Sequence, residues 1–311
     1  MRYSFIINPT AHEGRAKNTW SQLKNYLDTN NIEYNSNFTR YPGHATEIAQ
    51  QLTTQASSNT TVIVVGGDGT VDEAINGLYI KKKPRTINQL PIAIIPAGWQ
   101  NQFAKSLNIS ETPIEAFQQI SHTTQESTVY IGYYYESIKD EAGYFINSWG
   151  LGFDAALLSK QSEQKKGHRK MGPFSFIRNA GSILYNQQPY SLMVQEKQQH
   201  LLFANTFISS CYNHLVKGTP EQRHQSLLQP ELSLLIVERH NWLITLWTLW
   251  LLLTGKISKS RWAHLLTANQ FHYTTTSLEF VQKDGIELGN RFVDVTIESV
   301  PCQIWQNPTH T

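Results

Sequence analysis

The stretch Val62-Ile-Val-Val-Gly-Gly-Asp-Gly-Thr-Val-Asp-Glu-Ala-Ile-Asn-Gly77 predicts a strand, a glycine turn and a helix in direct succession. Its first four residues are β-branched, which is typical of a short buried strand. Gly66, Gly67 and Gly69 then surround a single acid, Asp68, and apolar residues follow at helical spacing. The stretch is therefore one strand-to-helix unit of the kind that builds parallel sheets.

The glycine turn favours the binding of an anion. Glycine lets the backbone approach a ligand closely, and the first N–H groups of a helix have no partner within the helix. Asp68 would repel phosphate in a turn that bound phosphate alone. A divalent cation between Asp68 and the phosphates removes that conflict. As a bare pattern, the turn is equally compatible with a tight connection that binds nothing.

The same alternation extends over the first 127 residues. Strands are predicted over 3–7, 33–39, 62–65 and 91–95. Helices are predicted over 16–27 and 43–53 and after the glycine turn, and the turn over 96–104 opens another helix. Ligands of parallel sheets bind at the carboxyl ends of the strands. We therefore expect the turns that follow the four strands to share one edge.

From about residue 128 the pattern changes to the period of two that half-buried strands show. Strands are predicted over 128–135, 144–149, 190–195, 202–209, 232–237, 272–280 and 292–297, and helices over 154–163, 173–185 and 241–254. The fold class is thus an α/β domain with a parallel sheet over residues 1–127, followed by a mostly antiparallel β-sandwich domain over 128–311. The last residues are free to return to the first domain.

Composition limits the classes of partner and compartment. The formal net charge is +2 and only 16% of residues are charged, so no basic surface of the kind that binds nucleic acid is expected. Cys211 and Cys302 form neither a metal-type spacing nor a disulfide framework, which fits a reducing, cytoplasmic setting. The N-terminal residues lack the apolar core and cleavage site of a signal peptide.

One apolar segment, residues 242–253, has two interpretations. It is shorter than the roughly 20 residues that a membrane-spanning helix needs. It is either a buried helix or, with three Trp and the following Lys256, Lys259 and Arg261, an anchor at a membrane surface.

Six landmarks occur in an order that resembles the bacterial soluble diacylglycerol kinase and lipid kinase family, which is related to sphingosine kinases and NAD kinases. They are Asn8-Pro9 with Gly14, Thr39 with Gly43-His-Ala45, Gly66 to Thr70, Pro96-x-Gly98 with Asn101, Gly152-Phe-Asp-Ala155, and Asp284-Gly285. The resemblance implies a two-domain fold, ATP and Mg²⁺ as cofactors, and a lipid hydroxyl as the acceptor of the phosphoryl group.

The resemblance also implies roles for individual residues. The residues implied to bind nucleotide are Asn8, Pro9, Thr39, Gly66, Gly67, Asp68, Gly69, Thr70, Gly98 and Asn101. Asp68 and Asp154 are implied to be catalytic and to hold the metal ion, Asp154 through water. Glu287 is a weaker candidate for the general base.

Several positions depart from the family pattern. Trp99 replaces a nucleotide-contacting Thr, where it could block the phosphate site or stack on a base. Gln102 replaces an Asp. Ala11 and His12 occupy the places of a Ser and a Gly in the first turn.

The second domain departs as well. Gln229-Pro230 replaces an Asp-Gly pair that holds a structural ion in the family, so we expect that ion to be absent. Ile286 occupies the place of the family's general base and cannot take a proton. Glu287 could serve only if an extra residue bulged the turn before it; otherwise it is a surface acid.

Three functions therefore stay open. The first is a lipid kinase that acts on a diacylglycerol-like lipid at the membrane surface, as a cytoplasmic or peripheral protein. The second is a catalytically impaired relative that keeps the fold and binds nucleotide or lipid. The third is an NAD kinase, since the glycine turn alone permits it. Exposed sheet edges make a homodimer a further expectation.

Overall fold

A computed structural model describes residues 2–55, 59–79, 90–153, 155–156, 188–196, 199–214, 220–254 and 256–306. The chain forms two compact units. Unit 1 comprises residues 1–131, 218–230 and 300–311, and unit 2 comprises residues 132–217 and 231–299. The segment 218–230 thus belongs to unit 1, whereas the sequence pattern assigned it to the second domain.

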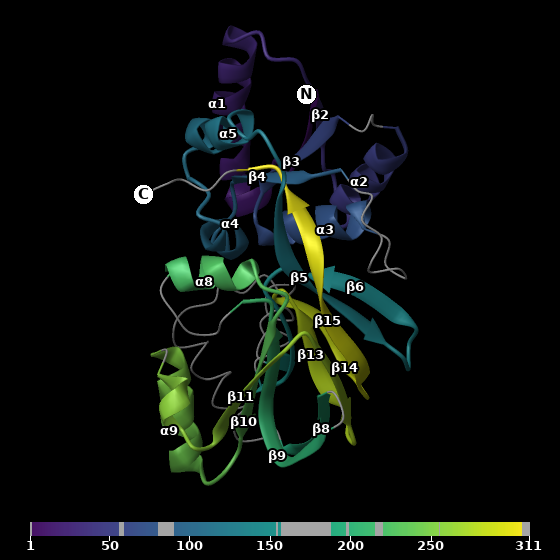
Figure 1. Ribbon diagram of the computed structural model, residues 1–311, viewed down its shortest axis with the longest axis vertical. Coiled ribbons are helices and arrows are strands. Elements are labelled where there is room, and N and C mark those ends of the chain that lie inside the picture. The colour runs from purple at the N-terminus through teal and green to yellow at the C-terminus, as the bar shows by residue number, and fades with distance from the viewer. Residues whose placement is uncertain are drawn as a thin grey trace. The chain divides into compact units, whose positions relative to one another are not determined.

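Unit 1 contains a parallel sheet whose strands lie in the order β2–β1–β3–β4 (Figure 1). The strands are β1 (Arg2–Ile7), β2 (Tyr34–Phe38), β3 (Thr60–Gly66) and β4 (Ile92–Pro96). Every residue of β3 is buried, which explains its uninterrupted β-branched run, because helices cover both faces of such a sheet.

Helices flank this sheet on both sides. They are the 3₁₀ turn η1 (Ala11–Gly14), α1 (Arg15–Thr29), α2 (His44–Gln55), α3 (Asp68–Leu78), α4 (Gln102–Ser106), α5 (Pro113–Ser121) and α8 (Pro220–Leu227). Figure 1 shows α1 and α5 on one side and α2 with α3 on the other. Trp20 of α1 and Phe117 of α5 pack against Phe5 of β1, with ring centroids 5.1 and 6.4 Å from its ring.

The end of the chain completes the β4 edge of this sheet. Ile304, in β15 (Asp294–Ile304), pairs with Ile92 in parallel. The buried side chain of Gln306 then acts as a partner for the backbone of Ile94. Its Oε1 accepts from the Ile94 N–H at 2.9 Å, and its Nε2 donates to the Ile94 carbonyl at 3.0 Å.

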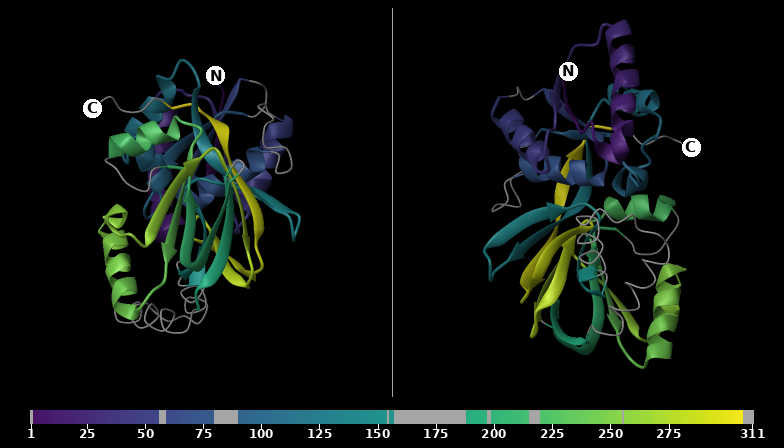
Figure 2. Two further views of the ribbon diagram at one scale, coloured as in Figure 1. Left: turned by 60° about the horizontal axis from the view of Figure 1, so that its bottom comes forward. Right: turned by 180° about the vertical axis from the view of Figure 1, so that it is seen from behind.

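Unit 2 is built from antiparallel strand pairs, which confirms the predicted fold class together with the parallel sheet of unit 1. Its strands follow the order β14–β13–β7–β9–β8–β12–β15, and β10 pairs with β9 and β11. Figure 2 shows these strands from two further sides. The strands and helices not yet given are β5 (Ser127–Glu136), β6 (Glu141–Phe145), β7 (Ser148–Gly152), β8 (Tyr190–Glu196), β9 (Gln199–Tyr212), β10 (Leu232–Glu238), α9 (Trp242–Leu253), η2 (Ile257–Lys259), β11 (Ala263–Ala268), β12 (Gln270–Thr275), β13 (Glu279–Lys283) and β14 (Ile286–Arg291). Trp149, Phe271 and Tyr273 are among the largest side chains of its core.

Two predicted strands are wrong as single elements. Residues 144–149 belong to β6 and β7, because the backbone N–H groups of Ile146, Asn147 and Ser148 all donate to the Asp284 carboxylate at 2.7–2.8 Å instead of to a neighbouring strand.

Residues 272–280 likewise divide into β12 and β13. The Thr275 hydroxyl donates to the Ser277 carbonyl at 3.0 Å, and the Ser277 hydroxyl donates to the Glu279 carboxylate at 2.8 Å. Such local bonds compete with the ladder bonds of a strand. The predicted helix over 173–185 lies outside the described residues, as does the one over 154–163 apart from residues 155 and 156.

Candidate functional site

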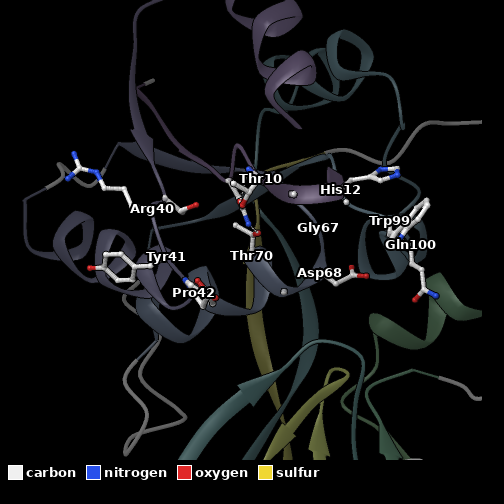
Figure 3. A pocket seen from close by; sticks show the side chains of 16 residues that line it. Thr10, His12, Arg40, Tyr41, Pro42, Gly67, Asp68, Thr70, Trp99 and Gln100 are labelled. Carbon is white, nitrogen blue, oxygen red and sulfur yellow. Dashed lines mark hydrogen bonds between the residues drawn. The ribbon is translucent and has the colours of Figure 1, made fainter. Parts of the chain in front are cut away.

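A pocket of about 530 Å³ opens at the carboxyl ends of the parallel strands of unit 1 (Figure 3). Its lining comes mainly from the turns that follow β1, β2, β3 and β4, so these turns do share one edge. The lining residues are Asn8, Thr10, Ala11, His12, Thr39, Arg40, Tyr41, Pro42, Gly67, Asp68, Gly69, Thr70, Glu73, Gly98, Trp99 and Gln100.

The glycines of the β3–α3 turn serve different purposes. A Cβ on Gly66 would lie 2.7 Å from the Cβ of Thr70, and one on Gly67 would lie 2.9 Å from the Cα of Gly98. Packing within the protein therefore requires these two glycines. A Cβ on Gly69 would have nothing within 4 Å, although glycine within a helix costs about 1 kcal/mol relative to alanine. Packing within the described part of the chain therefore does not require a glycine at position 69.

The β4–α4 turn packs directly on the first glycine turn. A Cβ on Gly98 would collide with the Cα of Gly67. Asn101 adopts a left-handed conformation, with φ of 50°. Its Oδ1 accepts from the Gly98 N–H at 2.8 Å and its Nδ2 donates to the Gly98 carbonyl at 3.2 Å. Asn101 thus fixes the shape of the turn that presents Trp99.

Two acids of α3 hold the neighbouring turns in place. The Asp68 carboxylate accepts from the backbone N–H groups of Gln102 at 2.9 Å and Phe103 at 3.1 Å, at the start of α4. The Glu73 carboxylate accepts from the N–H groups of Gly43 at 2.9 Å and Ala45 at 3.3 Å, at the start of α2. Each acid caps a helix N-terminus, where negative charge is favourable.

Asp68 keeps acceptor capacity beyond this capping role. A carboxylate has about four lone-pair positions, and each Asp68 oxygen accepts one of the two backbone bonds. The residue lines the pocket beside the open position of Gly69. Mg²⁺ is commonly bound through one or two carboxylates together with substrate phosphates and water. The residues present therefore fit a magnesium nucleotide.

The turn after β1 joins the same network. The Asn8 side-chain amide donates to the Thr70 hydroxyl at 2.9 Å, and Asn8 Oδ1 accepts from the Thr10 hydroxyl at 2.9 Å. Beyond it, His12 and Glu13 have φ values of 50° and 55°. Residues other than glycine rarely adopt this conformation. The strained turn presents His12 at one end of the pocket.

Trp99 contacts His12 at that end of the pocket. Their ring centroids are 4.2 Å apart, and Trp99 is 75% exposed. Figure 3 shows the two rings side by side, at the opposite end of the pocket from Tyr41. Two departures from the family pattern, 87 positions apart in the chain, are thus one contact. The indole borders the pocket and leaves the space beside Gly69 open.

The structure brings most of the predicted nucleotide-binding residues together. Those that line the pocket are Asn8, Thr39, Gly67, Asp68, Gly69, Thr70 and Gly98. Pro9, Gly66 and Asn101 do not line it, although Gly66 and Asn101 shape its turns. Asp154 lies outside the described residues.

Glu287 belongs to unit 2, in β14. The preceding turn, Asp284-Gly285, has φ values of 49° and 78°, as in a two-residue hairpin turn. The register shift lies after Glu287, because Gln282 pairs with Glu287 and Val281 with Gly289. The extra residue that would re-aim Glu287 is thus absent from this turn, and its role as a base stays a prediction.

Sequence reasoning missed several residues that line the pocket. They are Thr10, Arg40, Tyr41, Pro42, Glu73 and Gln100. All except Glu73 follow directly on predicted strands, so extending each strand by a few residues toward the ligand edge would have found them. No local signal marks Glu73, whose role depends on the packing of α2 against α3.

This chain is similar in sequence to proteins named as lipid kinases and in fold to a known diacylglycerol kinase. Residues 2–131 match the model of the diacylglycerol kinase catalytic domain. A Bacillus subtilis (strain 168) protein named "Putative lipid kinase YtlR" is 26% identical over 92% of this chain and 93% of its own length. The crystal structure of a diacylglycerol kinase from Bacillus anthracis (strain Sterne), 17% identical, covers 99% of this chain and 97% of that one with a TM-score of 0.66. The latter likeness shows the fold.

Proposed function

We propose that this chain, which is similar to bacterial diacylglycerol kinase-like lipid kinases, transfers the γ-phosphate of ATP to the hydroxyl of a diacylglycerol-like lipid. The observation that carries the proposal is the open position at Gly69 beside the Asp68 carboxylate. A glycine that packing does not require, next to an acid at a helix N-terminus, suits a phosphate chain with its metal ion.

Each element of the pocket has a part in this reaction. The backbone N–H groups at the start of α3 and the Thr70 hydroxyl would bind phosphate oxygens, and Asp68 would hold Mg²⁺. Bound Mg²⁺ would neutralise negative charge on the phosphates. Asn8, by donating to Thr70, would orient its hydroxyl. Phosphoryl transfer depends mainly on positioning and charge neutralisation, so a rigid network of this kind is what the reaction needs.

The acceptor hydroxyl must lose its proton, but the turn before Glu287 lacks the extra residue that this acid would need to serve as the base. Glu287→Gln removes the basic group at nearly constant volume, and we expect its turnover to stay close to that of the wild type. A loss of about 10²-fold or more would instead assign the role of general base to Glu287.

The direct test is transfer from γ-³²P-ATP with Mg²⁺ to a panel of acceptors. The panel contains a short-chain diacylglycerol, ceramide, sphingosine and NAD, and products are separated by chromatography. We expect labelled phosphatidate and its loss when EDTA removes Mg²⁺. Label on NAD alone would instead identify an NAD kinase.

A thermal-shift measurement with Mg-ATP distinguishes the remaining alternative. A ligand that binds only the native state raises the unfolding temperature by mass action. A clear shift without transfer to any acceptor would mark a relative that binds nucleotide but lacks catalysis. A protein that shows neither a thermal shift with Mg-ATP nor transfer to any acceptor would contradict the proposed function.

A further inference from the structure

Helix α9 of unit 2 has five large apolar residues on its exposed side. The face that it exposes, here called the α9 face, consists of Trp242, Leu243, Leu246, Trp247 and Trp250, each between 44% and 67% exposed. Their spacing places all five on one side of the helix. No helix in the described part of the chain combines the length and apolar character needed to cross a bilayer.

The opposite side of α9 is more polar than the α9 face. Thr245 and Thr248 are buried, at 1% and 0% exposure. The Thr245 hydroxyl donates to the Asn241 carbonyl at 3.1 Å, and the Thr248 hydroxyl lies 3.3 Å from that of Ser260. A solvated helix would instead carry polar residues on its exposed side. The exposed side of α9 therefore suits a non-aqueous environment better than water.

The helix is held firmly enough to present this face. The Asn241 side chain caps its N-terminus by accepting from the Ile244 N–H at 2.9 Å. Near the other end, Leu251 and Ile257 are buried in a cluster with Leu235. The rings of Trp247 and Trp250 stack with centroids 4.9 Å apart. The α9 face thus belongs to an ordered helix, which Figure 2 draws as a coiled ribbon.

Positive charge accompanies the α9 face. Lys256, Lys259 and Arg261 follow the helix and are exposed, and the Arg261 guanidinium lies 4.3 Å from the Trp262 ring centroid. Residues 239–278 contain no Asp or Glu. Indole rings favour the boundary between acyl chains and headgroups, and lysine or arginine beside them attracts anionic lipid.

We propose that the α9 face seats unit 2 in the surface of an anionic lipid bilayer. Twelve residues give a helix about 18 Å long, which would lie in the interface plane because spanning needs roughly 30 Å. A symmetric contact with a second copy would bring the same cations together, which charge disfavours. The inference rests on the proposed function only for its purpose, which is access to a lipid acceptor.

Sedimentation with vesicles tests binding without any turnover. Wild type, a Trp247→Gln/Trp250→Gln variant and a Leu202→Gln control are mixed with vesicles of phosphatidylcholine, with or without phosphatidylglycerol, in the absence of nucleotide. Leu202 is 70% exposed on β9, outside the α9 face. We expect the wild type and the control to bind anionic vesicles and the Trp variant to bind at least about tenfold more weakly. Equal binding of all three proteins, or none by the wild type, would overturn the proposal.

A Lys256→Gln/Lys259→Gln variant tests the charge component. We expect anionic binding to fall about fivefold for each cation removed, and binding of the wild type to weaken as salt is added. An unchanged affinity for anionic vesicles would contradict the choice of an anionic surface.

Quenching by lipids brominated on their acyl chains identifies the part that inserts. A Trp242→Phe/Trp247→Phe/Trp250→Phe variant keeps the apolar face but removes its indoles. We expect it to sediment with vesicles while losing most of the quenching seen in the wild type. Quenching that persists would place the inserted part elsewhere. Sedimentation velocity without lipid tests whether a second copy of the chain covers the α9 face instead. If the wild type is a dimer and the Trp247→Gln/Trp250→Gln variant is a monomer, a second copy is the partner.

These assays separate the inference from the proposed function. A protein that binds vesicles through α9 but transfers no phosphate would uphold the inference alone. A protein that phosphorylates a water-soluble short-chain acceptor but ignores vesicles would uphold the proposed function alone.

Discussion

The two glycine turns of unit 1 differ in which part of the family pattern they keep. The β3–α3 turn keeps all of Gly66 to Thr70, whereas the β4–α4 turn keeps Gly98 and Asn101 but carries Trp99 and Gln102. In the second turn the retained residues shape the backbone, and the altered ones are exposed side chains. The residues that shape the backbone of this turn therefore follow the family pattern, whereas its exposed side chains depart from it.

Gln102 shows why such a change can leave the scaffold intact. Its backbone N–H donates to Asp68 at 2.9 Å, and any residue except proline supplies that donor. The loss of the family's carboxylate at this position therefore leaves the link between the two turns in place.

The largest expected effect comes from removing the acid that links the two turns. In Asp68→Ala, turnover should fall about 10²-fold or more, because the variant loses the charge that we propose to hold the metal ion. The variant should also lose about 1–3 kcal/mol of unfolding free energy, since two N–H groups of α4 lose their acceptor.

Glu73→Ala is the matched control, because Glu73 also caps a helix through two backbone bonds. Both variants are compared by steady-state kinetics and by urea unfolding. We expect similar stability losses and a much smaller loss of turnover for Glu73→Ala. Equal losses of turnover would reduce Asp68 to a structural cap.

The next largest effect should follow from adding a methyl group where the two turns touch. In Gly98→Ala the new Cβ collides with Gly67, so the backbone of one turn must move. We expect a loss of about 1–3 kcal/mol of unfolding free energy, as for other overpacked sites. Urea denaturation measures it, and a variant as stable as the wild type would show that the turns have room to separate.

Gly69→Ala adds the same methyl group at a position where it meets open space, so its effect can be compared directly with that of Gly98→Ala. Stability should rise by up to about 1 kcal/mol, as expected for alanine in a helix. Affinity for Mg-ATP should nevertheless fall about tenfold, because the methyl group would fill the space proposed for the phosphate chain. Urea unfolding measures the stability, and titration with Mg-ATP measures the affinity. An unchanged affinity would show that the phosphates do not bind beside residue 69.

We expect the smallest effect on nucleotide affinity from Trp99, an exposed residue that departs from the family pattern. Trp99→Thr restores the family residue and removes the ring that packs on His12. If the indole stacks on the base of the nucleotide, affinity should fall by roughly three- to tenfold, the value of one aromatic contact. We expect this direction because the ring borders the pocket and leaves the position beside Gly69 open. Tighter binding in the variant would show instead that Trp99 obstructs the site.

Local patterns predicted much of this molecule because their causes are local. The β-branched run of β3 and the helical spacing after Asp68 each reflect burial of one short segment. The division of 144–149 into two strands has a distant cause, the Asp284 carboxylate, and no pattern within the segment reveals it.

In the candidate site, too, features with local causes could be predicted from the sequence and features with distant causes could not. The turns could be located from the sequence, because parallel strands place their carboxyl ends at one edge. The contact of Trp99 with His12 could not, because it requires the packing of two turns far apart in the chain. The helix capping by Asp68 was also missed, since a lone acid among glycines looks the same whether it binds metal, backbone or both.

The pairing of Gln306 with β4 has a consequence for how the protein is made. The catalytic-domain match ends at residue 131, but β4 gains its last backbone partner only when residue 306 has left the ribosome. At about 5–20 residues per second, the nascent chain spends roughly ten seconds or more with that strand edge bare. An isolated fragment of residues 1–131 would keep the bare edge permanently, and exposed edges invite pairing between chains. Expression of the isolated fragment should therefore yield aggregates.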